Sequence, residues 1–262
     1  MRTHLPIYLD RVIFEKDREV SGFLFRAENR IGVISQVADL FYEENLRIIH
    51  MTLSPVHQKY GWFLVYVDVT ECKKTSEEIV EKLKKFDFIQ EIKTIKPIKK
   101  GLIADSFFFP PTTNNEWVVI FRSSVLDGLF NILRDRLKEA GNRQLYLEGY
   151  KVGIDAFDSY VRLLGETDKE LLIRFGVEIL ISNGWGVGEV TEVSFEKAEG
   201  TFRVYNLFEC QIAKVENKCA SQFFRGALAG FCSRLFNRPM KCIETKCIRK
   251  GDNYCEFHIS PK

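Results

Sequence analysis

The last quarter of the chain is rich in side chains that can bind a metal ion. It contains six of the seven cysteines, and Glu244, Cys247 and Cys255 lie close together within it. Thiolates and carboxylates are common zinc ligands. Gly251 stands midway between the two cysteines, and the turn-forming sequence Gly251–Asn253 separates two apolar segments. We therefore expect a β-hairpin that places the two thiols opposite one another.

Two opposed thiols, with Cβ atoms roughly 4.5–5.5 Å apart, allow three chemical outcomes. They can share a metal ion, remain buried structural thiols, or form a Cys247–Cys255 disulfide. Glu244 and Cys247 are an odd number of residues apart, so a regular strand would direct them to opposite faces. A shared metal site therefore requires a bulge or a strand end between them. We expect Cys210, Cys232 and Cys242 to be packing residues.

Length and charge limit the class of protein. A chain of 262 residues with 45% hydrophobic residues is long enough for one or two domains with real cores. The net charge is only +2, from 38 basic and 36 acidic residues. This balance gives no general attraction to polyanions, so we do not expect nucleic acid to be a partner.

Membrane insertion and secretion are not expected either. No segment reaches the roughly 18 apolar residues that a membrane span requires, and the N-terminal residues lack the apolar core of a signal peptide. The odd number of cysteines fits free thiols or a metal site better than a secreted disulfide framework. We expect a cytoplasmic protein.

The first half of the chain predicts a ferredoxin-like βαββαβ domain. Apolar residues recur with helical or alternating periodicity in six successive segments, and turn-forming residues separate them. These elements are a strand at 22–26, a helix at 33–44, strands at 47–56 and 62–69, a helix that begins at Thr75, and a strand at 89–98.

Residues 20–97 resemble the ACT domain in this order of elements and in the turn Asn29–Gly32 before the first helix. The resemblance implies a regulatory module that pairs through its sheets or helices and often binds an amino acid at the interface. The corresponding candidates for ligand contacts are Asn29, Arg30, Ile31 and Gly32, because a helix N-terminus favours a carboxylate. A module that only dimerises remains the alternative.

A break in periodicity separates two domains. Proline and asparagine pairs mark loops in this region, so we expect an ACT-like domain at 1–98, a linker at 99–115 and a second domain at 116–262. Three adjacent phenylalanines, Phe107–Phe109, are unusual in a free linker and are expected to dock on one of the domains.

The second domain is predicted to be α+β, an antiparallel sheet with packed helices. Gly149 and Gly153 are spaced for close packing of one helix on another. The expected elements are a buried strand at 117–121, a helix ending near Gly141, helices at 145–164 and 169–181, strands at 187–195 and 201–208 joined by a turn at Glu199–Gly200, a helix at 217–236, and strands at 240–248 and 254–259.

Residues 115–262 are similar to the 4-vinyl reductase domain, most clearly in their last forty or so positions. The similarity rests on the helix with Cys219, on Glu244 and Cys247, and on the Gly251–Phe257 run. The family is viewed as a small-molecule, and in part hydrocarbon, binding module. In related sensor domains, one Cys, one Glu and two further Cys bind zinc beside the ligand cavity. The resemblance therefore implies a structural zinc held by Cys219, Glu244, Cys247 and Cys255.

Together these features favour a ligand-sensing regulatory protein that forms a homodimer and binds a small apolar molecule. Aromatic residues on helix faces could line the cavity, and they are Tyr146, Tyr150, Phe175 and Trp185. The sequence contains no phosphate-binding loop and no catalytic triad spacing, so we do not expect an enzyme. The alternative is an enzyme or enzyme subunit that acts on an apolar or tetrapyrrole-like substrate.

Overall fold

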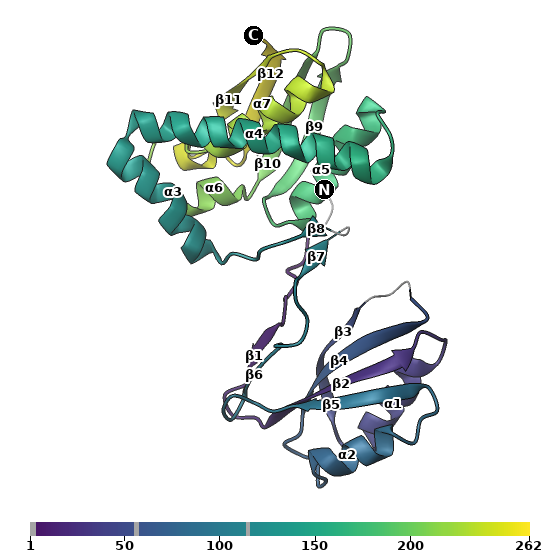
Figure 1. Ribbon diagram of the computed structural model, residues 1–262. Coiled ribbons are helices and arrows are strands. Elements are labelled where there is room, and N and C mark those ends of the chain that lie inside the picture. Colours follow the sequence, from purple (N-terminus) through teal and green to yellow (C-terminus); the bar gives the residue numbers. More distant parts are fainter. Residues whose placement is uncertain (1–3, 55–57, 114–115) are drawn as a thin grey trace. The chain divides into compact units, whose positions relative to one another are not determined.

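The computed structural model describes residues 4–54, 58–113 and 116–262. The chain divides into two compact units, residues 1–110 and 111–262 (Figure 1). The helices are α1 Val33–Glu43, α2 Ser76–Leu83, α3 Ser123–Leu137, α4 Glu139–Leu164, α5 Lys169–Ser182, α6 Phe208–Ile212 and α7 Gln222–Leu235. The strands are β1 Val12–Phe14, β2 Val20–Glu28, β3 Arg47–Ser54, β4 Tyr60–Asp68, β5 Ile89–Ile95, β6 Leu102–Ala104, β7 Thr112–Thr113, β8 Glu116–Trp117, β9 Val187–Ser194, β10 Glu199–Tyr205, β11 Met240–Lys246 and β12 Cys255–Pro261.

The first unit has the predicted βαββαβ order. Strands β2 to β5 form an antiparallel sheet in the order β3-β4-β2-β5, and α1 and α2 pack on one of its faces. The side chain of Thr75 caps α2 and Glu78 completes a capping box, as the sequence indicated. The predicted strand at 47–56 ends at Ser54, and its last two positions lie outside the described residues.

The other face of this sheet is covered as well, which the sequence did not predict. Strand β1 pairs antiparallel with β6, and Ile13 and Ile103 pack against Leu24 and Tyr66 of the sheet. This second layer explains why almost every position of β2 is buried, because a strand covered on both faces has no solvent side. Of the three phenylalanines, only Phe108 packs on this core.

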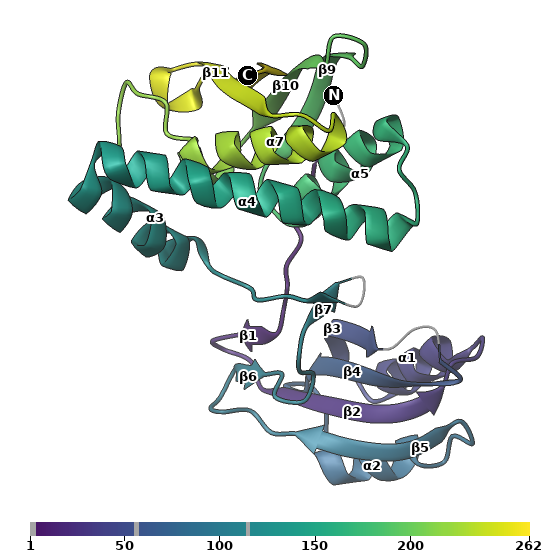
Figure 2. The ribbon, with the colours of Figure 1, turned by 45° about the horizontal axis from the view of Figure 1, so that its top comes forward.

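The second unit is a four-stranded antiparallel sheet in the order β11-β12-β10-β9, with helices on one face. Buried and half-exposed residues alternate along β10 and β12, as expected for a sheet with one face in solvent. Helices α4 and α7 lie side by side across the covered face, and both views show this (Figures 1 and 2). Phe202, Val204 and Phe257 form the floor of the core beneath them.

Several predictions for the second unit were wrong. The apolar run 117–121 is not a buried strand, because only Glu116–Trp117 form β8 and the side chains from Val119 to Phe121 are exposed. Glu199 and Gly200 belong to β10, and Ala198 with its positive φ lies in the turn instead. Phe208 begins the short helix α6, which the sequence did not reveal.

Helices α4 and α7 approach one another so closely that their backbones touch. A Cβ atom added at Gly149 of α4 would lie 2.0 Å from a backbone carbonyl oxygen of α7, and one added at Gly153 would lie 1.9 Å from another. In the same way, a Cβ atom added at Gly226 of α7 would lie 2.1 Å from a carbonyl oxygen of α4, and one added at Gly230 would lie 2.0 Å from another. The four glycines are therefore required by this contact. The predicted packing role of Gly149 and Gly153 is confirmed.

We predict that Gly230→Ala lowers the free energy of unfolding by about 3 kcal/mol, because the methyl group forces the two helices apart. Gly128→Ala is the matched control, since its Cβ on α3 would meet no atom within 4 Å. This control should gain up to about 1 kcal/mol from helix propensity. Urea denaturation followed by circular dichroism measures both values, and equal stabilities would contradict the close contact.

Candidate metal and ligand sites

Three buried thiols meet below the first turn of α7. The Sγ atom of Cys210 lies 3.7 Å from that of Cys247 and 3.6 Å from that of Cys255. All three cysteines are completely buried, and all seven in the chain are free thiols. The donor atoms of these three thiols and of Glu244 all lie within 4.8 Å of one another, so the group could hold a metal ion.

A β-bulge brings Glu244 to the same side as Cys247. The register of β11 against β12 shifts between Glu244 and Lys246, which is the irregularity that their spacing demanded. Both carboxylate oxygens of Glu244 are buried and have no hydrogen-bond partner among the described residues. A buried carboxylate without partners is costly, and a bound cation would satisfy it. The donor set and this carboxylate therefore fit a metal ion.

The third cysteine of the cluster is not the one that the sequence led us to expect. Cys210, on α6, is the third thiol of the cluster, whereas the sequence suggested that it was a packing residue. Cys219 lies at the edge, half-exposed, with its thiol close to Glu244 and Cys247. Sequence spacing could not reveal Cys210, because α6 is short and only its first residue, Phe208, falls within the strand predicted at 201–208.

The electrostatics of the cluster also suit a cation. Hydrogen bonds from its neighbours lower the pKa of Cys247, whereas the pKa of Cys210 is raised by its contacts with Cys247 and Cys255. Burial raises the pKa of Glu244 to about 8. Burial and the crowding of these donors therefore oppose the build-up of negative charge in the cluster. A divalent ion removes that repulsion and favours deprotonation of the remaining ligands.

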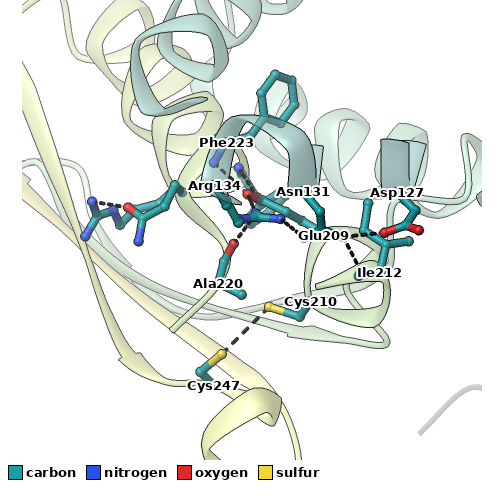
Figure 3. A network of polar contacts seen from close by, with 12 residues as sticks. Asp127, Asn131, Arg134, Glu209, Cys210, Ile212, Ala220, Phe223 and Cys247 are labelled. Carbon is teal, nitrogen blue, oxygen red and sulfur yellow. Dashed lines mark hydrogen bonds and ion pairs between the residues drawn. The ribbon is translucent and has the colours of Figure 1, made fainter. Parts of the chain in front are cut away.

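The residue before Cys210 is the centre of a buried polar network (Figure 3). Glu209 is fully buried, and its Oε1 atom accepts hydrogen bonds from Arg134 Nη2 at 2.6 Å and from the Phe223 backbone N–H at 3.0 Å. Its Oε2 atom accepts from the Phe224 N–H at 2.8 Å. Helix α7 has no side-chain cap from its own N-cap residue, so Glu209 serves as its cap.

Helix α3 joins the same network. Arg134 also donates to the carbonyl of Ala220 at 2.6 Å and to Asn131, and Asn131 donates to the carbonyl of Ile212 at the end of α6. Burial raises the pKa of Glu209 to about 7, against the lowering effect of the backbone N–H groups and of Arg134. The network fixes α3, α6 and the start of α7 relative to one another.

A cavity of about 520 Å³ lies between α4, α5, α7 and strands β9 and β10. Its wall is mostly apolar and includes Phe175, Trp185 and Phe231. The ring of Tyr160 contacts Phe175 edge-on, and burial raises the pKa of its hydroxyl to about 12. At one side the wall is completed by Glu116 of β8, which accepts a hydrogen bond of 2.6 Å from Ser159.

Two of the four aromatic candidates line this cavity and two do not. Phe175 and Trp185 form part of its wall. The rings of Tyr146 and Tyr150 lie elsewhere in the core, beneath the side chains of Arg225 and Lys262 respectively. The sequence alone did not reveal which of these aromatic residues face the space between α4, α5 and α7.

In the first unit, side-chain contacts tie the turn before α1 to neighbouring segments. Asn29 donates to the carbonyl of Gln58 at 2.6 Å, and Arg30 pairs with Asp87 at 2.5 Å. Gly32 has a φ of 92° and begins α1 without a side-chain cap. The side chain of Ile31 is fully exposed. The Asn29 and Arg30 side chains are therefore engaged within the unit, and an uncapped helix start lies beside them.

Comparison with known families agrees with this division of the chain. The ACT domain family matches residues 23–88, and the 4-vinyl reductase domain family matches residues 201–261. The chain has an ACT-like domain followed by a 4-vinyl reductase type domain.

Individual relatives cover parts of the chain. An uncharacterized protein of Methanocaldococcus jannaschii is 29% identical over 115 residues, which are 44% of this chain and 62% of that one. The chain thus spans less than two thirds of the length of this curated relative. The crystal structure of the phenol-responsive sensory domain of the transcription activator PoxR with phenol aligns with a TM-score of 0.51, at 17% identity, over 56% of this chain and 77% of that domain. A vinyl-4-reductase family protein of M. jannaschii aligns at 18% identity with a TM-score of 0.38, over 55% of this chain and 83% of that one.

An ACT-like domain and a 4-vinyl reductase type domain together fit a regulatory role. The similarity to the PoxR domain shows a shared fold. In the described part of the chain, no helix has the length and apolar character to cross a bilayer.

We predict that Arg134→Ala lowers the free energy of unfolding by about 3–5 kcal/mol, because it leaves the buried Glu209 carboxylate without its cationic partner. Arg136→Ala on the exposed side of the same helix is the control and should change stability by at most about 0.5 kcal/mol. Thermal unfolding by calorimetry distinguishes the two. Similar losses in both variants would show that the ion pair does not hold the helices together.

Proposed function

We propose that this protein is a ligand-sensing regulator that binds a small apolar molecule in its 4-vinyl reductase domain. The observation that carries the proposal is the apolar cavity between α4, α5 and α7. Its volume of about 520 Å³ lies within the range of roughly 300–1,000 Å³ that is usual for small-molecule sites. Binding would be transmitted to the ACT domain, and so to its pairing or to a protein partner.

The wall of the cavity defines the class of ligand. Aromatic rings such as Phe175, Trp185 and Phe231 favour a flat or hydrocarbon-like molecule. The hydroxyl of Tyr160 is protonated at neutral pH, as in any tyrosine whose pKa is not lowered, so it can donate one hydrogen bond to a polar group of the ligand. The PoxR sensory domain, which shares the fold, was crystallised with phenol. A small aromatic compound is therefore the first class of ligand to test.

The metal that the cluster would hold is zinc, in a structural role. A tetrahedral ion with Zn–S bonds of about 2.3 Å places neighbouring sulfurs about 3.8 Å apart. The observed separations of 3.6 and 3.7 Å from Cys210 to Cys255 and Cys247 are close to this value. Three thiolates and a carboxylate form a closed shell with no open position for a substrate. Seven free thiols also support a location in the reducing cytoplasm.

For the ACT domain, we propose pairing with a second copy. Ile31, Ile34 and Tyr42 are large apolar residues that lie exposed on or next to α1. Burial of such a stripe against its own copy would explain it. The uncapped start of α1 at Gly32 supports an amino-acid carboxylate as a second ligand there.

Native mass spectrometry of the full chain, purified without chelator, tests the proposal. We expect a dimer that carries a metal ion and a small molecule in each chain. The affinity for phenol, followed by quenching of tryptophan fluorescence, should fall at least about tenfold in Ala156→Phe, because the ring fills the cavity. Ala140→Phe on the exposed start of α4 is the control. If apolar ligands bind equally well to both variants, the cavity is not the binding site.

We also predict that Cys247→Ser releases the zinc and lowers the melting temperature, because the binding energy of a structural metal is part of the folding energy. Elemental analysis of the purified chain gives the zinc content, and calorimetry gives the melting temperature. Cys72→Ser in the first unit serves as the control and should keep both. Wild-type zinc content and melting temperature in Cys247→Ser would contradict the metal site.

A further inference from the structure

The apolar cavity of the second unit has one polar side. Glu116 of β8 and two residues of α4, Ser159 and Arg162, belong to its wall there. Glu116 Oε1 accepts a hydrogen bond from Ser159 Oγ at 2.6 Å and lies 3.7 Å from Arg162 Nη2. The side chains of Glu116 and Arg162 are 60% and 68% exposed, so the cavity meets solvent on this side.

Glu116 differs from the other acidic residues of the wall in where its contacts lead. Asp155 forms an ion pair with Lys151, which lies outside the wall. Glu189 accepts a hydrogen bond of 3.4 Å from the hydroxyl of Tyr205, which also lies outside it. The described partners of Glu116 are themselves residues of the wall, so its carboxylate is held beside the cavity.

Both of these contacts reach the same carboxylate oxygen. Ser159 and Arg162 approach Oε1 of Glu116. An ionised carboxylate has about four acceptor sites on its two oxygens. A ligand can therefore donate a hydrogen bond to Oε2 while the contact with Ser159 persists. Because hydrogen bonds to a charged acceptor are stronger than those between neutral groups, such a ligand would be favoured.

Tyr160 adds a hydrogen-bond donor to the same wall. It follows Ser159 on α4, and its ring contacts Phe175 edge-on. Burial raises the pKa of its hydroxyl, and the negative charge of Glu116 raises that pKa further. The wall thus offers a donor and a charged acceptor. A phenolic hydroxyl can use both, because it donates and accepts. A methyl group can use neither, and a ligand carboxylate cannot donate and would be repelled by Glu116.

We propose that Glu116 selects the ligand by accepting a hydrogen bond from the hydroxyl of an aromatic molecule whose ring lies among the aromatic side chains of the cavity. This inference rests on the cavity binding proposed above and names the polar group of the ligand. Glu116 lies only six positions after Pro110, the last residue of the first unit. A ligand hydroxyl therefore acts directly on the segment that joins the two units.

Phenol and toluene are a matched pair of ligands, because toluene has a methyl group in place of the hydroxyl at nearly the same size. We expect Glu116→Ala to weaken phenol binding at least about tenfold, as for loss of a hydrogen bond to a charged group, and to change toluene binding by less than about twofold. Titration calorimetry of the full chain measures both affinities. Equal losses for the two ligands, or no loss for phenol, would overturn the proposal.

Glu166→Ala is the control variant. It removes the same charge from an exposed position just after α4 that does not belong to the wall. Both affinities should remain at their wild-type values. The unchanged toluene affinity of Glu116→Ala serves as a second control, because it shows that this variant is folded and that its cavity is intact.

Hydrogen exchange followed by mass spectrometry tests the effect on β8. At equal saturation, phenol should slow exchange in the peptide that contains Glu116 and Trp117 more than toluene does, because only phenol binds the carboxylate of this strand. Equal protection by the two ligands would contradict contact between the hydroxyl and β8.

The two proposals fail in different ways. A wild-type chain that binds neither phenol nor toluene contradicts the cavity site itself. Ala156→Phe should weaken both ligands, because it fills the cavity, whereas Glu116→Ala should weaken only phenol. Tighter binding of benzoate than of phenol would contradict only the role of Glu116, because it would show that Arg162 receives the polar group of the ligand.

Discussion

The packing of the helices in the second unit depends on the hydrogen bonds to the buried carboxylate of Glu209. This carboxylate has no exposed surface, so it is tolerable only because Arg134 and two backbone N–H groups supply its hydrogen bonds. Three helices meet at this one group, since Glu209 belongs to α6, Arg134 to α3, and the N–H groups to the first turn of α7. The next residue after Glu209 is Cys210, so the same turn of α6 also positions one thiol of the cluster that Cys210, Glu244, Cys247 and Cys255 form. The geometry of that cluster therefore depends on the packing of α3, α6 and α7.

The cavity depends on the small residues that lie between the helices. Glycines allow α4 and α7 to touch along their backbones, and the cavity wall also contains small residues, among them Gly153, Ala156, Gly176 and Ala227. Close packing usually leaves few voids in a protein core. Here the small side chains leave part of the space between α4, α5 and α7 unfilled. The aromatic rings around this space are held by edge-to-face contacts such as that between Tyr160 and Phe175. Small residues therefore both bring the helices together and leave room for a ligand.

The sequence was most informative where the cause was local. Periodicity gave the βαββαβ order of the first unit, and the odd spacing of Glu244 and Cys247 predicted the irregularity in β11 that the structure shows. It was least informative about contacts between distant segments. Cys210 joins Cys247 and Cys255 only because α6 turns under α7, and no spacing rule relates positions so far apart. The apolar run 117–121 looked like a buried strand, but hydrophobicity alone does not supply a partner for it.

The first turn of α7 lies between the cysteine–glutamate cluster and the cavity. The backbone N–H of Phe224 donates to Glu209, and its ring lines the cavity and packs at 5.1 Å from Phe257 of the sheet. A ligand that displaces this ring therefore acts on the same turn whose start is fixed by Glu209, and any shift there must be accommodated by Arg134 on α3. Buried polar networks tolerate few alternative arrangements, because each lost hydrogen bond leaves a desolvated group. A ligand in the cavity would therefore act on α3, the first helix of the second unit, through the contacts of Phe224, Glu209 and Arg134.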